Sequence, residues 1–122
     1  MNFNQLVACC FNVRDQAHYL HLGSHTLGHH LALGTFYEDL TELLDELVEV
    51  WQGTSMQLID TKPPRTRCPD FTDPLELLNW FFDTLAAERY EAIPDQQTHL
   101  QNILDEVVSV TARARTKIKF YR

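Results

Sequence analysis

Apolar residues recur every three or four positions in four segments of the chain, the spacing of one buried face of an α-helix. The first segment spans about residues 3 to 22, and the second, with the most regular pattern, spans about residues 26 to 52. Thr26 can cap the start of the second helix, and Gly53 can end it. The apolar stripe of this second helix consists of Leu33, Phe36, Tyr37, Leu40, Leu43, Leu44, Leu47 and Trp51.

The second half of the chain predicts two more helices after a long connection. Residues 53 to 72 contain three prolines and no sustained period, which is typical of a connecting segment. Asp73, Pro74 and Glu76 form a helix-start signal for a third helix to about residue 91, and Pro94 interrupts the chain before a fourth. Two helical hairpins joined by a long crossover are the connectivity of an all-α, ferritin-like four-helix bundle.

Composition and charge limit the classes of protein to which this chain can belong. A chain of 122 residues with four glycines predicts a single domain, residues 1–122, built from long regular elements. The net charge of −7 disfavours DNA binding, although five cations gather at the C-terminal end, where they also suit a helix dipole. Without an apolar run of membrane-spanning length or a signal peptide, the chain is expected to be cytoplasmic, not membrane-bound, with three reduced thiols.

Five of the six histidines lie within residues 16–30, followed by a helix rich in acids. On an ideal helix, Asp45 and Glu49 lie about 60° and 100° around the axis from His30, away from the apolar stripe, and Asp45 lies roughly 20 Å along it. One metal cannot span that separation, whereas an antiparallel two-fold dimer brings His30 of one copy beside Asp45 and Glu49 of the other, and His18 can join them. Such nitrogen and oxygen donors suit Fe(II), Mn(II) or Zn(II).

Other interpretations of these histidines and acids remain. The acids can form a solvated acidic face, and His18, His21 and His25, or His25 and His29, have spacings compatible with a local zinc site if the first helix continues through Gly23. His21 falls on the apolar stripe of the first helix, where a hydrogen-bonded core histidine is expected.

The spacings of twelve residues from His18 to His30, fifteen to Asp45 and four to Glu49 resemble the ferroxidase centre of the Dps family of miniferritins. The letters QAHY around His18 are similar to the QAHW of that family, with Tyr19 in place of tryptophan. The resemblance implies that His18 and His30 of one subunit and Asp45 and Glu49 of its mate are the catalytic and metal-binding residues. They would oxidise Fe(II) with peroxide or oxygen, and a twelve-subunit shell would store the ferric mineral.

The sequence also resembles small ferritin-like proteins of bacterial viruses, which would place it in the host cytoplasm. It lacks the lysine-rich N-terminal tail by which some Dps proteins bind DNA, so DNA binding is not expected. We therefore expect an iron-binding homo-oligomer, at least a dimer, with ferroxidase activity. The alternative is a non-catalytic ferritin-like protein that binds another protein through its acidic face or basic C-terminus.

Overall fold

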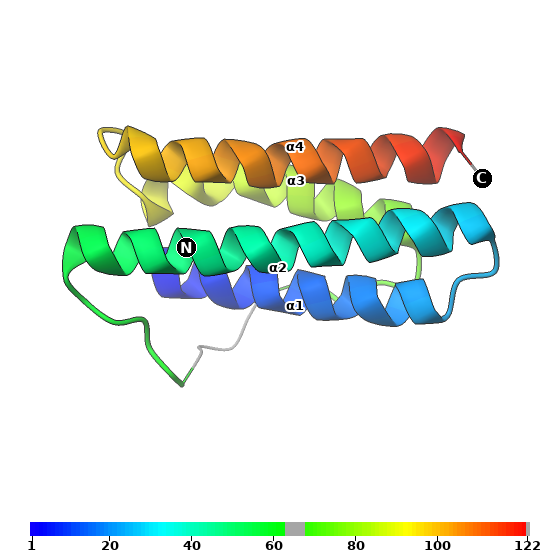
Figure 1. The fold of residues 1–122 in the computed structure, drawn as a ribbon, viewed down its shortest axis with the longest axis horizontal. Helices are drawn as coiled ribbons and strands as arrows, with labels where there is room; N and C mark the ends of the chain where they lie inside the picture. Colours follow the sequence, from blue (N-terminus) through cyan, green and yellow to red (C-terminus); the bar gives the residue numbers. More distant parts are fainter. Residues whose placement is uncertain (63–67, 122) are drawn as a thin grey trace.

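The computed structural model describes residues 1–62 and 68–121, and this part of the chain contains four α-helices and no strand (Figure 1). They are α1 (Phe3–Leu22), α2 (Leu27–Ser55), α3 (Pro74–Ala92) and α4 (Thr98–Phe120). The predicted all-α four-helix bundle is therefore confirmed. Within the described residues, no helix is both long enough and apolar enough to cross a membrane.

The helix boundaries confirm the predicted start signals and correct one predicted end. The Thr26 hydroxyl accepts a hydrogen bond from the His29 amide at 3.2 Å, and the Asp73 carboxylate accepts one from the Glu76 amide at 3.1 Å. The prediction that Gly53 ends the second helix is wrong, because α2 continues to Ser55 and Met56 takes the left-handed conformation with φ 55°. Gly53 is helical here, since a helix interior tolerates a glycine at a modest cost.

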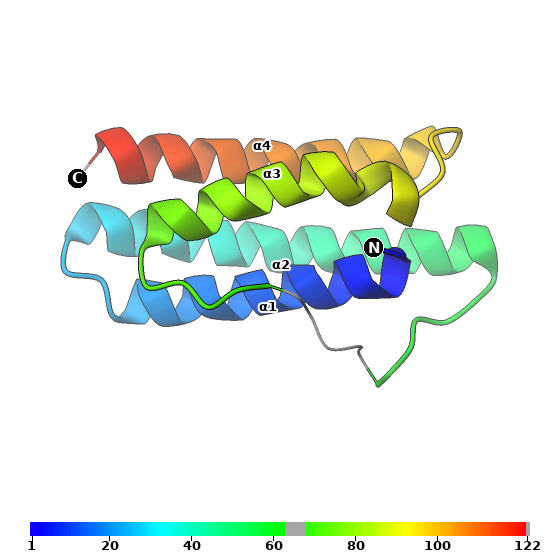
Figure 2. The same cartoon turned by 180° about the vertical axis from the view of Figure 1, so that it is seen from behind.

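Each helix packs mainly against two others: α2 packs against α1 and α4, and α3 also packs against α1 and α4. Figures 1 and 2 show that each of these neighbouring pairs is antiparallel, and that α2 and α3 run in the same direction. The predicted crossover between α2 and α3 includes residues 63–67, which lie outside the described residues. The shared core contains Phe36 of α2, whose ring meets the edge of Phe81 of α3 at a centroid distance of 6.2 Å.

Gln16 holds the described end of the connection before α3 against α1. Its side-chain amide donates to the Pro69 carbonyl at 2.8 Å, and its oxygen accepts from the Phe71 amide at 2.9 Å. The same amide also contacts the Cys68 sulfur at 3.4 Å. Gln16, the first residue of the QAHY stretch, therefore has a structural role. His18, two residues later on α1, is exposed on the outer surface.

Gln101 is a buried polar residue that joins α4 to the end of α3. Its Nε2 donates to the Ile93 carbonyl at 2.9 Å, while its Oε1 accepts from Arg89 Nε at 2.8 Å. Arg89 also donates to the Gln101 carbonyl at 2.9 Å and to Asp105 at 2.7 Å. This network satisfies polar groups that would otherwise be buried without a partner.

Replacing Gln101 with leucine is expected to lower the free energy of unfolding by about 1–3 kcal/mol, because Arg89 and the Ile93 carbonyl lose a partner where water cannot replace it. Urea denaturation followed by circular dichroism measures this loss. The control is Gln57→Leu, the same substitution at an exposed position. Equal urea midpoints for the two variants would contradict a structural role for the hydrogen-bond network of Gln101.

Candidate metal centre

His21 and His30 face each other across the turn between α1 and α2, and each ring bonds to the backbone of the other residue. The His30 Nδ1 lies 3.0 Å from the His21 carbonyl oxygen, and the His21 Nδ1 lies 2.5 Å from the His30 carbonyl oxygen. The rings stack at a centroid distance of 3.9 Å with an interplanar angle of 17°. Because a carbonyl oxygen only accepts, each Nδ1 must carry the proton, and Nε2 of each neutral ring keeps its lone pair. Metal-binding histidines commonly have this arrangement.

His18 lies on the outer surface of α1 against Tyr37 of α2. The two rings stack at 4.1 Å with an interplanar angle of 20°, and Tyr37 also meets the edge of the His21 ring at 5.4 Å. His18 is exposed and borders a shallow hollow of about 400 Å³ with Asp15, Tyr19 and Leu22. Stacking on the half-buried Tyr37 therefore orients the imidazole while leaving it accessible from outside.

Gly34 makes room for the His21 ring. A Cβ added at Gly34 would lie 2.9 Å from His21 Cε1, closer than real Cβ contacts, and 3.1 Å from His21 Nδ1, which is tighter than most of them. The missing side chain lets the ring lie against α2 and reach the His30 carbonyl. His21 is half-buried and hydrogen-bonded. The expected hydrogen bond is therefore present, but the residue lies at the edge of the core.

The carboxylates of Asp45 and Glu49 are exposed on α2, one turn apart. Within the described part of the chain, neither has a hydrogen bond or an ion pair. Because α2 is continuous from Leu27 to Ser55, the rise per residue puts Asp45 roughly 20 Å from His30 along the axis. One copy of the chain therefore leaves the two predicted halves of the site apart.

The alternative prediction, a zinc site formed by neighbouring histidines of one chain, required the first helix to continue through Gly23. This requirement is not met. α1 ends at Leu22, so His25 does not share its face with His18 and His21. His25 is exposed, and the His29 ring bonds to the Ile118 carbonyl of α4 at 3.2 Å. Among residues 1–62 and 68–121, no three His, Cys, Asp or Glu side chains are grouped so as to hold a metal ion.

One stripe of α2 faces away from the bundle and carries Leu27, Leu31, Glu38, Asp45 and Glu49, all exposed. At 100° per residue, these five positions fall within about 40° around the helix axis. The leucines occupy the N-terminal half of the stripe, and the acids occupy the rest. We call this surface the exposed stripe of α2. Its two halves therefore differ in chemistry, one apolar and one acidic.

The cysteines lie apart from this surface. Cys9 and Cys10 are buried, and Cys68 is half-buried. Burial raises the pKa of the Cys10 thiol to about 12. The pKa of Cys9 is raised mainly by a hydrogen bond with Cys68 and secondly by burial. The same hydrogen bond lowers the pKa of Cys68. Cys9 and Cys10 thus stay protonated at neutral pH.

The fold and these surfaces define an all-α, four-helix bundle protein with imidazoles and carboxylates on the outer faces of α1 and α2. The chain belongs to a family of unknown function, DUF5856, whose model matches residues 21–118. The match contains His30, Asp45 and Glu49, whereas His18 lies before it. The chain matches no curated protein and no solved structure.

Proposed function

We propose that the chain is a Dps-like iron-binding protein that oxidises Fe(II) at a site formed between two copies. In this site His18 and His30 of one copy meet Asp45 and Glu49 of the other. The observation that carries the proposal is the His30 ring, whose Nδ1 is committed to the His21 carbonyl and whose Nε2 is left for a metal. The unpartnered carboxylates on the same helix support it as the complementary half.

The geometry of α2 favours a two-fold pairing of copies. When α2 lies antiparallel to its own copy, the segment around His30 runs beside the segment around Asp45 and Glu49, and the contact occurs twice. Leu27 and Leu31 are 72% and 58% exposed and offer apolar surface for such a contact. Glu38 would lie close to its own copy near the axis, and bound Fe(II) would offset the repulsion between the acids.

The donor set has the chemistry that the proposed reaction needs. Imidazole nitrogens bind Fe(II), and carboxylate oxygens favour the more highly charged Fe(III) that oxidation produces. Iron is the substrate, and each molecule of hydrogen peroxide accepts two electrons from two Fe(II) ions and two protons from water, which yields two Fe(III) ions and two molecules of water. Zn(II) and Mn(II) fit the same donors and would compete for them. Storage of ferric mineral in a twelve-subunit shell belongs to the same proposal.

Fe(II) oxidation tests the site directly. Protein loaded anaerobically with Fe(II) is mixed with peroxide or oxygen, and ferric absorbance is recorded. His30→Ala and Asp45→Asn are each expected to slow oxidation at least about tenfold, because each removes one ligand from a small set. His25→Ala and Glu46→Gln remove an exposed histidine and an exposed acid on other faces and should oxidise iron as the wild type does. Equally slow oxidation in all five proteins would remove the enzyme proposal.

A second candidate function rests on the apolar surface at the end of the α1–α2 hairpin. Tyr19 is 79% exposed and Leu22 is 67% exposed in the last turns of α1, and Leu27 and Leu31 are exposed in the first turns of α2. Exposed apolar surface of this kind is typical of protein interfaces. A non-catalytic protein that binds another protein there would show no iron oxidation above background, and its solution mass would be that of one chain.

A further inference from the structure

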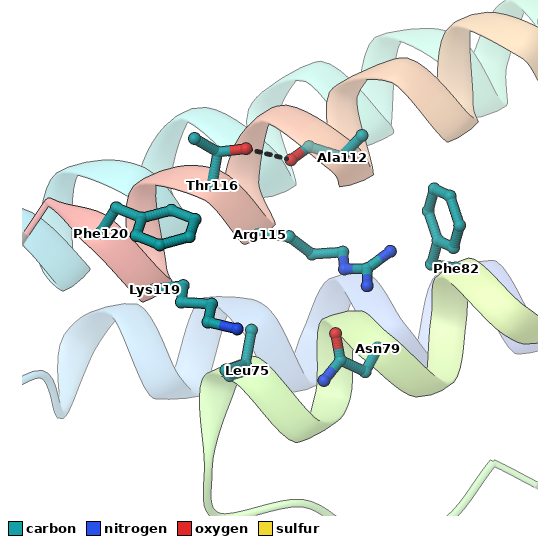
Figure 3. Close-up of a pocket in the computed structure, with 8 residues that line it drawn as sticks. All are labelled: Leu75, Asn79, Phe82, Ala112, Arg115, Thr116, Lys119 and Phe120. Atoms are coloured by element: carbon teal, nitrogen blue, oxygen red, sulfur yellow. Dashed lines mark hydrogen bonds between the residues drawn. The ribbon is translucent and has the colours of Figure 1, made fainter.

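A groove lies on the opposite half of the bundle, between the start of α3 and the end of α4 (Figure 3). Its volume is about 390 Å³. Leu75 and Phe82 of α3 and Phe120 of α4 supply apolar walls, while Arg115 and Lys119 of α4 supply positive charge. This size is at the lower end of the range for small-molecule sites.

The two cations of the groove have aromatic neighbours in place of acidic ones. The Arg115 guanidinium lies over the Phe82 ring at 4.3 Å, and the Lys119 ammonium lies 5.6 Å from the Phe120 ring. Among the described residues, none of those that line the groove is an acid. Within the described residues, neither cation has an ion pair, unlike Arg89, which pairs with Asp105. In the described part of the chain, the groove therefore holds two cations that no acid pairs with.

We propose that this groove binds a small organic anion, a carboxylate on a planar apolar body. The Phe82 ring lies against the Arg115 guanidinium, and the edge of the guanidinium can donate two parallel hydrogen bonds to a carboxylate. Lys119 adds a second positive charge. Leu75 and Phe120 border the space beside the two cations, where the apolar body would be removed from water.

The surroundings favour a small ligand over a nucleic acid. Glu76 and Asp83 are exposed on α3, each next in sequence to a residue of the groove. A polyanion extended along the groove would approach these acids, and the net charge of −7 opposes it further. A compact anion can contact Arg115 and Lys119 without reaching Glu76 or Asp83.

Calorimetric titration of the full chain with naphthoate, a planar aromatic carboxylate, tests the proposal. The groove variant is Arg115→Gln with Lys119→Gln. The matched control is Arg113→Gln with Lys117→Gln, which removes the same charge from the same helix beside Asp39, outside the groove. Wild type and control are expected to bind one naphthoate per chain, and the groove variant is expected to bind at least about tenfold more weakly. Naphthylmethanol, which is neutral, should bind at least about tenfold more weakly than naphthoate to the wild type.

Three results would overturn the proposal. The first is no naphthoate binding by the wild type, and the second is an equal loss in both double variants, which would indicate only general charge attraction. The third is a change in solution mass in the groove variant alone, since this would mean that a second copy of the chain covers the groove. The proposal does not depend on the iron site, because α1 and α2 carry the proposed ligands, and the groove variant should oxidise Fe(II) at the wild-type rate.

Discussion

Mixing two inactive variants is expected to restore about one quarter of the wild-type sites for Fe(II) oxidation. One variant carries His18→Ala and His30→Ala, and the other carries Asp45→Asn and Glu49→Gln. Random pairing makes half of the dimers mixed, and each mixed dimer has one intact site and one site without any ligand. Recovery arises because the intact histidines lie on one chain and the intact carboxylates lie on the other. The rate after joint unfolding and refolding of an equimolar mixture measures it.

Two controls make this recovery interpretable. Each variant refolded alone should remain inactive while its circular dichroism and urea midpoint show a folded bundle, because His30→Ala removes a ring that stacks on His21. Mixing the two folded proteins without unfolding should give slower recovery, at the rate at which subunits exchange. If both variants are inactive alone and no activity returns in the refolded mixture, the four ligands do not act across two subunits.

The sequence was sufficient to predict the helices because their burial follows a local period. The regular apolar stripe of α2, with Leu33, Phe36, Leu40, Leu44 and Leu47 now buried, specifies which face meets the other helices. The error at Gly53 arose because a glycine is able to end a helix but also fits inside one. Where α2 ends depends on the left-handed backbone at Met56, a residue whose type does not signal that conformation.

The candidate site was predictable only in part. The positions of His30, Asp45 and Glu49 around α2 follow from the helix repeat, and a continuous helix from Leu27 to Ser55 bears out their placement on one element. The reciprocal bonds between His21 and His30 depend on how closely α1 approaches α2, which no spacing within one helix specifies. The signal that could have indicated this approach is Gly34, four residues after His30, since a missing side chain often marks close packing.

The groove could not be predicted from the sequence, for a related reason. The cations at the end of α4 were visible as a cluster, and its last turn does contain Lys117 and Lys119, as the helix dipole favours. What separates Arg115 from Arg113 is the partner of each across the bundle. Arg115 stacks on Phe82 of α3, whereas Arg113 borders the hollow beside Asp39 of α2. Such pairings between distant segments arise only from the packing of helices.

Replacing Leu27 and Leu31 with glutamate is expected to convert the assembly into single chains of 14.2 kDa and to abolish iron oxidation, although all four proposed ligands remain. The dimer would bury four leucines, each worth about 1–2 kcal/mol at these exposures, so that their loss weakens association by about three to six orders of magnitude. The new glutamates would also face Asp45 and Glu49 of the second copy. Sedimentation equilibrium measures the mass, and ferric absorbance measures the oxidation.

The matched control for this variant is Met56→Glu with Leu58→Glu, which places two glutamates at apolar positions that are 85% and 82% exposed at the other end of α2. Both proteins carry the same added charge, so a change of mass in the leucine variant alone assigns the contact to the exposed stripe of α2. A wild type that is already a single chain would contradict the shared site at once. If the leucine variant loses its pairing but still oxidises iron at the wild-type rate, each chain must hold its iron alone, and the roles of Asp45 and Glu49 as ligands for the histidines of a second copy would have to be abandoned.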